Sequence, residues 1–458
     1  MVDLGSIIKA YDVRGVVPEA FDEEIARAIG AAFAIFCGGP SVTPRVVIAY
    51  DMRPSSIPLS TAFAEGVCAQ GINVVDAGLG STDLLYYASG AMNIPGAMFT
   101  ASHNPAQYNG IKMCRAAAAP IGQDSGLLEI RANAERFLDG RGIPTSDAVP
   151  GTVEHEDVLA AYATYLRGLV DISGIRHLKV VVDAGNGMGG HTVPAVLDNL
   201  PLTIIPLYFE LDGTFPNHEA NPIEPENLVD LQKAVLEHGA DIGLAFDGDA
   251  DRCFVVDETG AIVSPSVLTA LIASRELAKE PGATIIHNLI TSRAVPEIVT
   301  ELGGVPIRTR VGHSFIKERM AETGAIFGGE HSGHFYFRDF WRADSGMLAA
   351  LHTLAALGEQ GGTLSALLSG YARYSASGEI NSVVSDQAAT TAAIEADWGQ
   401  REGVTLDHLD GLTVSLPNGD WFNLRPSNTE PLLRLNAEAA TGERLASLRD
   451  EVLAAIRS

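Results

Sequence analysis

The sequence predicts three similar α/β domains with mixed, mostly parallel sheets, followed by a smaller α+β domain. The prediction rests on an opening that occurs three times: a short apolar strand, a loop of small or polar residues, then a segment with helical spacing. The three strands cover residues 45–50, 178–182 and 283–287. They lie roughly 100–140 residues apart, a spacing typical of whole domains. Alternating strands and helices indicate mostly parallel sheets covered by helices.

The last part of the chain has a different pattern. After about residue 369 come short alternating runs such as residues 412–416, and then a helical segment at residues 443–456. This pattern is typical of a smaller α+β domain. Linkers are expected at residues 140–152, which are rich in Pro and Gly, and at the turn near Glu258. The expected domains are residues 1–149, 150–256, 257–369 and 370–458.

The composition limits the partners of the chain. The 458 residues carry a formal net charge of −26, which disfavours nucleic acid and anionic membranes as partners. The longest weakly charged helical segment, residues 345–358, is too short to span a bilayer. The N-terminus shows no signal-peptide pattern. The four cysteines lie far apart without paired spacing, so we expect buried free thiols and a cytoplasmic protein.

Residues 246–252 (FDGDADR) lie between two short apolar strands. Asp247, Asp249 and Asp251 occupy alternate positions, so their carboxylates can converge on one hard cation such as Mg²⁺ or Ca²⁺. A calcium loop of the EF-hand type has similar spacing, but it needs Gly at the position where this chain has Arg252. Arg252 places a positive charge next to the expected metal ion, and this arrangement is favourable if a dianion binds between the two.

Residues 101–105 (ASHNP) follow the apolar strand at residues 96–100, at the end of a strand where open α/β sheets place their active sites. Ser102 is therefore a candidate nucleophile or phosphate carrier. It does not lie in a hydrolase elbow, because the flanking glycines are absent. Lys112 supplies a cation nearby, and a general base if its pKa is lowered. Arg14, near the start of the chain, could grip a phosphate.

Two further polar loops follow. Residues 328–334 (GGEHSGH) place Glu330, Ser332 and two histidines among glycines, which suits sugar hydroxyls. A zinc site there would lack a third ligand at suitable spacing. Residues 425–431 (RPSNTEP) combine Arg425 with hydroxyls, an amide and backbone N–H groups, which is the composition of an anion cradle.

Residues 185–190 (GNGMGG) fit the GxGxxG dinucleotide fingerprint after a strand, with Glu210 about twenty residues further on. The rival interpretation is a tight turn from strand to helix. A nicotinamide-linked oxidoreductase that uses this loop would leave the other polar loops unexplained, and Asp183 would face the pyrophosphate. This activity stays open as the more distant alternative.

Four of these segments resemble the signature loops of the α-D-phosphohexomutase superfamily. They are TASHNP at residues 100–105, DGDADR at 247–252, GEHSGH at 329–334 and RPSNT at 425–429. The likeness extends from YDVRG at residues 11–15 to the last domain, and it is greatest to the bacterial phosphomannomutase/phosphoglucomutase group. Tyr50, where a basic residue is frequent, and Ala250, where Gly is common, depart mildly from the family pattern.

The resemblance implies four domains around a central cleft, with a C-terminal domain that closes on the ligand. The activity it implies is interconversion of hexose 1-phosphate and hexose 6-phosphate, for mannose and for glucose, through a phosphoserine and a hexose 1,6-bisphosphate. It also implies Mg²⁺, a phosphosugar as the partner, hexose 1,6-bisphosphate as activator, and a monomer or weak dimer. The nearest alternative activity is that of a phosphoglucosamine mutase.

The resemblance also implies roles for particular residues. Ser102 would carry the phosphoryl group, and the Mg²⁺ ligands would be its phosphate, Asp247, Asp249 and Asp251. The groups around the transferring phosphate would be His103, Lys112 and Arg252, and those that handle protons would be Arg14, Lys112 and His334. The sugar would contact Tyr11, Gly312, His313, Glu330, Ser332 and His334. The phosphate that is not transferred would contact Arg425, Ser427, Asn428 and Thr429.

Overall fold

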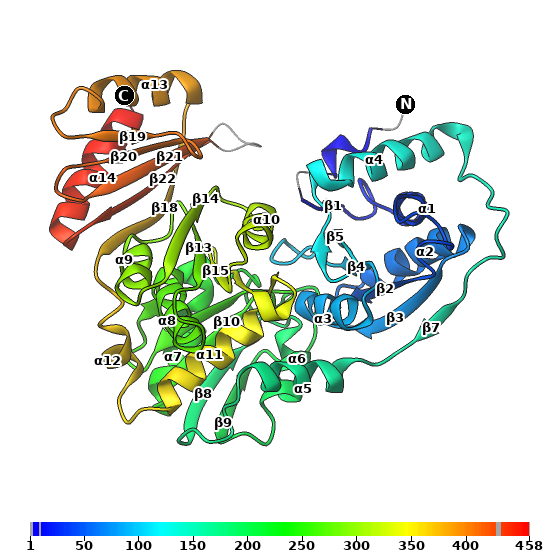
Figure 1. Cartoon of the computed structure of the whole chain (residues 1–458), viewed down its shortest axis with the longest axis horizontal. Coiled ribbons are helices and arrows are strands. Elements are labelled where there is room, and N and C mark those ends of the chain that lie inside the picture. Colours follow the sequence, from blue (N-terminus) through cyan, green and yellow to red (C-terminus); the bar gives the residue numbers. More distant parts are fainter. Residues whose placement is uncertain (1–2, 9–10, 427–431, 458) are drawn as a thin grey trace.

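The computed structural model describes residues 3–8, 11–426 and 432–457. It confirms three α/β domains and a smaller fourth domain. Figure 1 shows them along an arc, with the first and the C-terminal domain at its two ends and the other two domains between them. Within the described residues, no helix is both long and apolar enough to cross a membrane.

The sheet of the first domain has the order β1-β5-β4-β2-β3-β7, with β6 on the edge of β5. β2 runs parallel to β3 and β4, whereas β5 is antiparallel to its neighbours β1 and β4. The strands are β1 (Val13–Val16), β2 (Arg45–Tyr50), β3 (Asn73–Leu79), β4 (Gly96–Phe99), β5 (Tyr108–Arg115), β6 (Ala119–Pro120) and β7 (Val153–His155). The helices are α1 (Glu23–Phe36), α2 (Ser56–Ala69), α3 (Thr82–Met92) and α4 (Leu127–Arg136).

Glycines set the packing of α1 against α2 in this domain. A methyl group on Gly30 would collide with the backbone carbonyl of Phe63, and one on Gly66 would collide with that of Arg27. The two helices therefore cross at close range, and their apolar faces cover one side of the sheet.

The second domain has the sheet order β12-β11-β10-β8-β9. β8, β9 and β10 are parallel, and β11 returns antiparallel to β10. The strands are β8 (Leu178–Asp183), β9 (Leu202–Leu207), β10 (Ile242–Phe246), β11 (Cys253–Asp257) and β12 (Ile262–Val263). The helices are α5 (Leu159–Leu169), α6 (Gly189–Leu197) and α7 (Val229–His238).

The third domain repeats this plan with the order β14-β13-β15-β16-β17, in which β13 is parallel to β14 and β15. The strands are β13 (Thr284–Asn288), β14 (Val305–Thr309), β15 (Phe327–Gly329), β16 (Phe335–Phe337) and β17 (Ala343–Asp344). The helices are α8 (Pro265–Lys279), α9 (Ala294–Glu301), α10 (His313–Thr323), α11 (Gly346–Gly358) and α12 (Leu364–Leu368). The low charge of α11 has a simple cause: the whole helix is buried, and Ser345 caps its N-terminus.

The C-terminal domain has an antiparallel sheet of order β18-β22-β21-β20-β19. The strands are β18 (Ser375–Val383), β19 (Thr405–Asp407), β20 (Leu412–Ser415), β21 (Trp421–Pro426) and β22 (Leu432–Ala439), and the helices are α13 (Gln387–Trp398) and α14 (Gly442–Ile456). This domain has an apolar core of its own, separate from the core that runs through the other three.

Asp83, near the start of α3, ties the first three domains together. Its buried carboxylate accepts hydrogen bonds from Ser81, from the hydroxyl of Tyr162 in α5 at 2.8 Å, and from Ser345 before α11 at 2.7 Å. The fourth domain is joined to the third by surface bridges such as Arg308 to Asp407 at 2.7 Å. The first three domains therefore form one packed unit.

Strand pairing extends beyond two of the expected domain boundaries. β7 still pairs with β3 of the first sheet, although the second domain was expected from residue 150. β12 pairs with β11, so the turn at Glu258 is a hairpin of the second sheet rather than a linker. We therefore propose boundaries near residues 156 and 264.

The cysteines are free, but the expected burial holds for only two of them. Cys114 and Cys253 are buried, whereas Cys37 and Cys68 are half-buried. Cys37 lies at the C-terminus of α1, where no further turn of helix covers it. Cys68 lies on α2 and lines a surface pocket.

Candidate active site

The turn after β10 brings the three carboxylates together. Ala250 adopts a left-handed φ of 57°, so the loop folds back and the chain returns as β11. The side chains of Asp247, Asp249 and Asp251 are buried, with one oxygen of each within 4.8 Å of the others. Oδ1 of Asp249 and Oδ1 of Asp251 have no hydrogen-bond partner among the described residues. Buried, unpartnered carboxylate oxygens fit a hard cation such as Mg²⁺.

Burial and neighbouring charges affect these carboxylates differently. Burial raises the pKa of Asp247 to about 7, although Arg252 opposes the shift. Burial also disfavours ionised Asp249, but Lys112 and hydroxyl donors outweigh it and hold the pKa of Asp249 below its ordinary value. A divalent cation would favour the ionised form of all three groups.

Ser102 follows β4 and faces this loop from the first domain. Its φ of 51° is left-handed, which is uncommon for a residue other than glycine. Its Oγ donates a hydrogen bond to Oδ2 of Asp247 at 2.7 Å and lies 3.3 Å from Nδ1 of His103. The second domain can approach this closely because Gly248 has no side chain: a methyl group there would collide with the carbonyl oxygen of Ser102.

Cationic side chains surround the Ser102 hydroxyl and the carboxylates. Arg252 is buried and donates from Nε to Asp247 at 2.9 Å, while its Nη2 has no partner among the described residues. Arg14 donates to Oδ1 of Asn104 at 2.5 Å, within the Ser102 loop. Burial lowers the pKa of His103 to about 2, with Arg252 and Arg14 adding to the effect, so its imidazole is neutral at pH 7.

Lys112, on β5, lies between two of the carboxylates. Its Nζ is 2.7 Å from Oδ2 of Asp249 and 2.6 Å from Oδ2 of Asp251. Burial opposes the ammonium form, but Asp249 and Asp251 outweigh it and raise the pKa of Lys112 well above its ordinary value. The lowered pKa that a general base requires is therefore not present in this structure, and Lys112 is a cation.

His334, at the end of the third-domain loop, reaches the same place. Its Nδ1 lies 3.0 Å from Oδ2 of Asp344 and 3.8 Å from Oδ1 of Asp251. Burial disfavours the imidazolium, but Asp251 and Asp344 outweigh it and raise the pKa of His334. Asp344 is in turn paired with the buried Lys317 at 2.7 Å. The His334 ring is therefore held on its Nδ1 side.

Glu330 is buried and held on both carboxylate oxygens. Tyr336 donates to Oε1 at 2.6 Å, and the side-chain amide of Asn288 donates to Oε2 at 3.1 Å. Ser332, on the same loop, is half-buried. These contacts fix the carboxylate of Glu330 in one orientation, which suits recognition of hydroxyl groups.

Tyr11 and Gly312 bring the first and third domains together. The φ of Gly312 is 131°, and a methyl group on it would lie 2.8 Å from the hydroxyl of Tyr11. Burial raises the pKa of Tyr11, which also feels the charges of Arg310, Asp410, Glu330 and Arg425. His313 begins α10, and its side chain lies outside the described part of the structure.

Arg425 lies near the end of β21 in the C-terminal domain. Its ion pairs are long, 3.6 Å to Glu379 and 3.7 Å to Asp410, so neither carboxylate holds it tightly. Asp410 also accepts the backbone N–H of Val311 at 3.1 Å, which links this end of the site to the third domain. The other predicted members of the anion cradle, Ser427, Asn428 and Thr429, lie outside the described residues.

The GxGxxG segment is a packing turn between β8 and α6. A methyl group on Gly187 would lie 2.7 Å from the carbonyl oxygen of Gly248, and one on Gly190 would collide with the backbone of Phe209. The backbone N–H of Met188 donates to the carbonyl of Gly248 at 2.9 Å. These glycines therefore let the β8–α6 turn support the metal-binding loop, and the tight-turn interpretation accounts for them.

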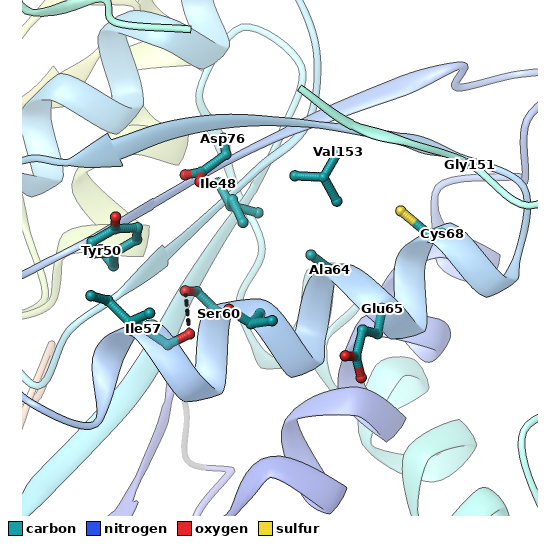
Figure 2. A pocket seen from close by; sticks show the side chains of 11 residues that line it. Ile48, Tyr50, Ile57, Ser60, Ala64, Glu65, Cys68, Asp76, Gly151 and Val153 are labelled. Atoms are coloured by element: carbon teal, nitrogen blue, oxygen red, sulfur yellow. Dashed lines mark hydrogen bonds between the residues drawn. The ribbon is translucent and has the colours of Figure 1, made fainter. Parts of the chain in front are cut away.

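A surface pocket of about 280 Å³ lies elsewhere, on the first domain between α2, β3 and β7. Figure 2 shows Ile57, Ser60, Ala64 and Cys68 along one face of α2, opposite Val153. The pocket contains neither Ser102 nor the carboxylate cluster. It plays no part in the arrangement described above.

Several residues of the site were not singled out from the sequence. Thr82 donates from Oγ1 to Oδ2 of Asp249 at 2.5 Å. Asp344 contacts His334, and Asn288 and Tyr336 both donate to Glu330. Thr82 begins the helix after β3. The rule that polar residues after parallel strands face the active site would have pointed to it.

A serine hydroxyl that faces three carboxylates, among an arginine, a lysine and a histidine, defines a phosphoryl-transfer site in a four-domain α/β protein. Comparisons with known proteins agree. Profiles of the phosphoglucomutase/phosphomannomutase family match its α/β/α domain I at residues 5–138, domain II at 160–260, domain III at 264–374 and the C-terminal domain at 379–455. The chain belongs to the phosphoglucomutase/phosphomannomutase family, which confirms the expected superfamily.

The relatives resemble the chain over almost its whole length. A phosphomannomutase of Salmonella montevideo is 41% identical over 440 residues, 94% of each chain. A protein of Xanthomonas campestris described as phosphohexose mutases is 41% identical over 435 residues, again 94% of each. A crystal structure of a phosphoglucomutase/phosphomannomutase family protein from Burkholderia thailandensis is 34% identical. It superposes with a TM-score of 0.88, covering 100% of this chain and 98% of that one.

Proposed function

We propose that this chain is a phosphohexomutase that interconverts the 1- and 6-phosphates of mannose and of glucose through a phosphoserine and a hexose 1,6-bisphosphate. The observation that carries the proposal is the position of Ser102. Its hydroxyl lies 2.7 Å from Asp247, beside a buried arginine whose Nη2 has no partner among the described residues. A buried guanidinium donor without a partner destabilises the folded protein unless an anion binds it.

At the reacting end, Ser102 carries the phosphoryl group, and Arg252, Lys112 and His103 surround it. Asp247, Asp249 and Asp251, together with the phosphate, would hold Mg²⁺, and the bound ion would supply positive charge that stabilises the transferring group. Phosphoryl transfer depends mostly on positioning and charge stabilisation. The cluster of cations, within a Debye length of about 8 Å, also attracts a dianion to a chain of net charge −26.

The reaction has two half-reactions. A hydroxyl of the sugar phosphate attacks phosphorus on Ser102, so a bond from phosphorus to the sugar oxygen forms and the bond to Oγ breaks. The sugar hydroxyl gives up its proton, and Oγ takes up a proton to become the serine hydroxyl. The bisphosphate then turns end for end. Oγ of Ser102 then gives up its proton and forms a bond with the other phosphorus, the bond from that phosphorus to the sugar oxygen breaks, and a proton is added to the sugar oxygen. His334 is suited to exchange this proton, because Asp344 occupies its Nδ1 side and no described residue forms a hydrogen bond with its Nε2.

At the distal end, Arg425 and the cradle of Ser427, Asn428 and Thr429 hold the phosphate that is not reacting. Glu330 and Ser332 hold the 3- and 4-hydroxyls, which mannose and glucose share, and Tyr11, Gly312 and His313 line the ring. A site that must accept the ring in both orientations cannot fit tightly around C2. Because no residue is assigned to C2, we expect both hexoses to react, with mannose as the cellular substrate and glucosamine phosphates as poorer substrates.

The test is a coupled mutase assay with mannose 1-phosphate, glucose 1-phosphate and glucosamine 1-phosphate, with and without glucose 1,6-bisphosphate. Wild type should turn over the first two, and Ser102→Ala should lose activity by orders of magnitude while its thermal unfolding stays unchanged. Intact-mass measurement should find one phosphate on wild type and none on the variant. A fully active Ser102→Ala variant would exclude the phosphoserine. Preference for glucosamine would favour the alternative mutase.

A further inference from the structure

The loop that presents Ser102 has little backbone hydrogen bonding of its own. β4 ends at Phe99 and β5 begins at Tyr108, so eight residues, 100–107, form a connection in which Ser102 takes a left-handed φ. Inside the loop, the backbone N–H of Asn104 donates to Ala101, and that of Tyr108 to Pro105. Backbone bonds of this kind do not explain why Ser102 holds its uncommon conformation.

Side chains add further contacts: the hydroxyl of Thr100 accepts the backbone N–H of Ser102 at 2.8 Å, and one buried side chain, Arg53, contacts the loop carbonyls. Its Nη1 donates to the carbonyl oxygens of Pro105 at 2.8 Å and Tyr108 at 2.9 Å. Its Nη2 donates to the carbonyl oxygens of Ser102 at 2.8 Å and Asn104 at 2.7 Å. Its Nε donates to Asp51 at 3.2 Å. All five N–H groups of the guanidinium are used, and its side chain is fully buried.

The position of Arg53 is itself fixed by two neighbours, Asp51 and Phe215. Asp51, also fully buried, accepts the backbone N–H of Arg53 at 3.0 Å as well as its Nε, and it accepts the hydroxyl of Ser56 at 2.5 Å. The ring of Phe215, from the second domain, covers the guanidinium at 5.0 Å. The planar fork therefore cannot shift without moving the loop carbonyls.

A lysine at position 53 could not form these hydrogen bonds. Four carbonyl oxygens spread along residues 102–108 need donors at fixed, coplanar positions, which the guanidinium fork supplies and a compact ammonium group does not. Arg53 grips the carbonyl of Asn104 while Arg14 donates to its side chain at 2.5 Å. Arg53 therefore holds the backbone of the loop, and Arg14 holds one of its side chains.

From this geometry we propose that Arg53 is the positioning residue of the phosphoserine loop. It holds the backbone so that Oγ of Ser102 points at Asp247, without touching the substrate. The inference rests on the proposed mutase function and extends it to a residue to which that function assigns no role. Because Arg53 acts only at the reacting end, its loss should slow phosphoryl transfer and leave binding at the distal end in place.

The test compares Arg53→Lys with Arg27→Lys. Arg27 lies in the same domain and donates two hydrogen bonds to Glu65, but on the surface. We expect Arg53→Lys to lower kcat about 100-fold, the scale of a misplacement of roughly 1 Å, with KM changed less than about threefold. Phosphorylation of Ser102 by glucose 1,6-bisphosphate, followed by intact mass in a single turnover, should slow equally. Arg27→Lys should match wild type.

A second variant and a second measurement keep the inference testable if Arg53→Lys does not fold. Asp51→Asn would place an amide N–H₂ against Nε of Arg53, and we expect an intermediate loss of kcat with unchanged KM. Hydrogen exchange at residues 102–108 should accelerate in both variants and not in Arg27→Lys. Wild-type kcat in either folded variant would overturn the inference, as would an equal loss in Arg27→Lys. An inactive wild type would instead refute the proposed function, and hydrogen exchange would still decide the role of Arg53.

Discussion

Arg252 and His334 pair with each other as an isolated antiparallel β-bridge. The bridge joins the loop of residues 247–252 in the second domain to the loop of residues 329–334 in the third, and the backbone N–H of Cys253 extends it with a bond to the carbonyl of Gly333 at 3.4 Å. The backbone of one loop therefore sets the position of the other. Arg252, which donates to the same Asp247 oxygen as Ser102, and His334 are therefore held in one fixed relationship.

Gly333 should be essential to this bridge. Its φ is 85°, and an added methyl group would lie 2.6 Å from the ring of Phe254. We expect Gly333→Ala to lower the free energy of unfolding by more than the roughly 1–3 kcal/mol of left-handed strain alone, and to lower kcat. Gly324→Ala is the matched control, because Gly324 also has a positive φ, 68°, but open space around it. Urea unfolding of both variants checks this, and equal destabilisation would show that the contact with Phe254 does not matter.

Thr82 should contribute to Mg²⁺ binding without being a ligand. Its Oγ1 donates to Oδ2 of Asp249 at 2.5 Å, and its backbone N–H donates to the carbonyl of Asp249 at 3.0 Å. Loss of such an outer partner typically weakens a metal site by about 10–100-fold. Calorimetric titration of Mg²⁺ into Thr82→Val should show this loss, and Asp249→Asn a larger one. Thr61→Val, on the exposed surface of the first domain, should bind like wild type. An unchanged affinity in Thr82→Val would remove Thr82 from the site.

The sequence predicted the parts of the site whose residues are neighbours in the chain. The carboxylates at alternate positions of residues 247–251 share one turn, and Ser102 follows a strand directly, so a local pattern carried both. Thr82 and Asp249 are 167 positions apart, and Arg53 is 49 positions from Ser102. The position of Thr82 after a strand could suggest that it faces the site, but no local pattern reports these two contacts. The first depends on how two domains pack, and the second on the order of the strands within the first domain.

The same limit explains the glycine segment at residues 185–190. Its spacing predicted either a nucleotide site or a tight turn, and the structure shows what the glycines contact. Gly187 faces the backbone of Gly248, which belongs to a loop about sixty residues further along the chain. Close approach of two backbones and close approach of a backbone to a pyrophosphate both require glycine, so the residue type alone does not distinguish them.

His218 should make stability depend on pH. Its Nε2 lies 3.0 Å from the buried carboxylate of Asp183, its Nδ1 lies 2.9 Å from the carbonyl of Glu219, and the edge of its ring meets Tyr208. Burial disfavours the charged imidazole, but Asp183 outweighs it and raises the pKa of His218. The stabilisation from the charged His218–Asp183 pair is complete below the pKa of histidine in the unfolded chain, about 6.5. It is lost as the pH rises through the raised pKa of His218 in the folded protein.

We therefore expect the stability difference between wild type and His218→Gln to be larger at pH 6 than at pH 9. Urea unfolding at several pH values measures it. His155→Gln serves as the control, because His155 is exposed and lies 4.0 Å from its nearest carboxylate, Asp76. A difference that grows with rising pH would contradict the assigned cause.

Arg425 should act on binding more than on chemistry. Its carboxylate partners lie at 3.6 and 3.7 Å, too far for good hydrogen bonds, so a phosphate can compete for the guanidinium. A charge-assisted bond of this kind is worth about 1.5–3 kcal/mol, which corresponds to roughly 10–150-fold in affinity. We expect Arg425→Ala to raise KM within that range with a smaller fall in kcat, and to leave phosphorylation of Ser102 by glucose 1,6-bisphosphate possible at high concentration.

The neighbouring Arg434 provides the control for this prediction. It lies opposite Arg425 in the β21–β22 ladder and shares the carboxylate of Glu379 at 3.4 Å. Arg434→Ala removes a positive charge from the same sheet, so it reproduces any general loss of electrostatic attraction. If both variants raise KM equally, the effect comes from the overall electrostatic field of the C-terminal domain and not from a contact between Arg425 and a phosphate. If Arg425→Ala lowers kcat with KM unchanged, Arg425 acts in the transition state, and the distal-phosphate assignment is wrong.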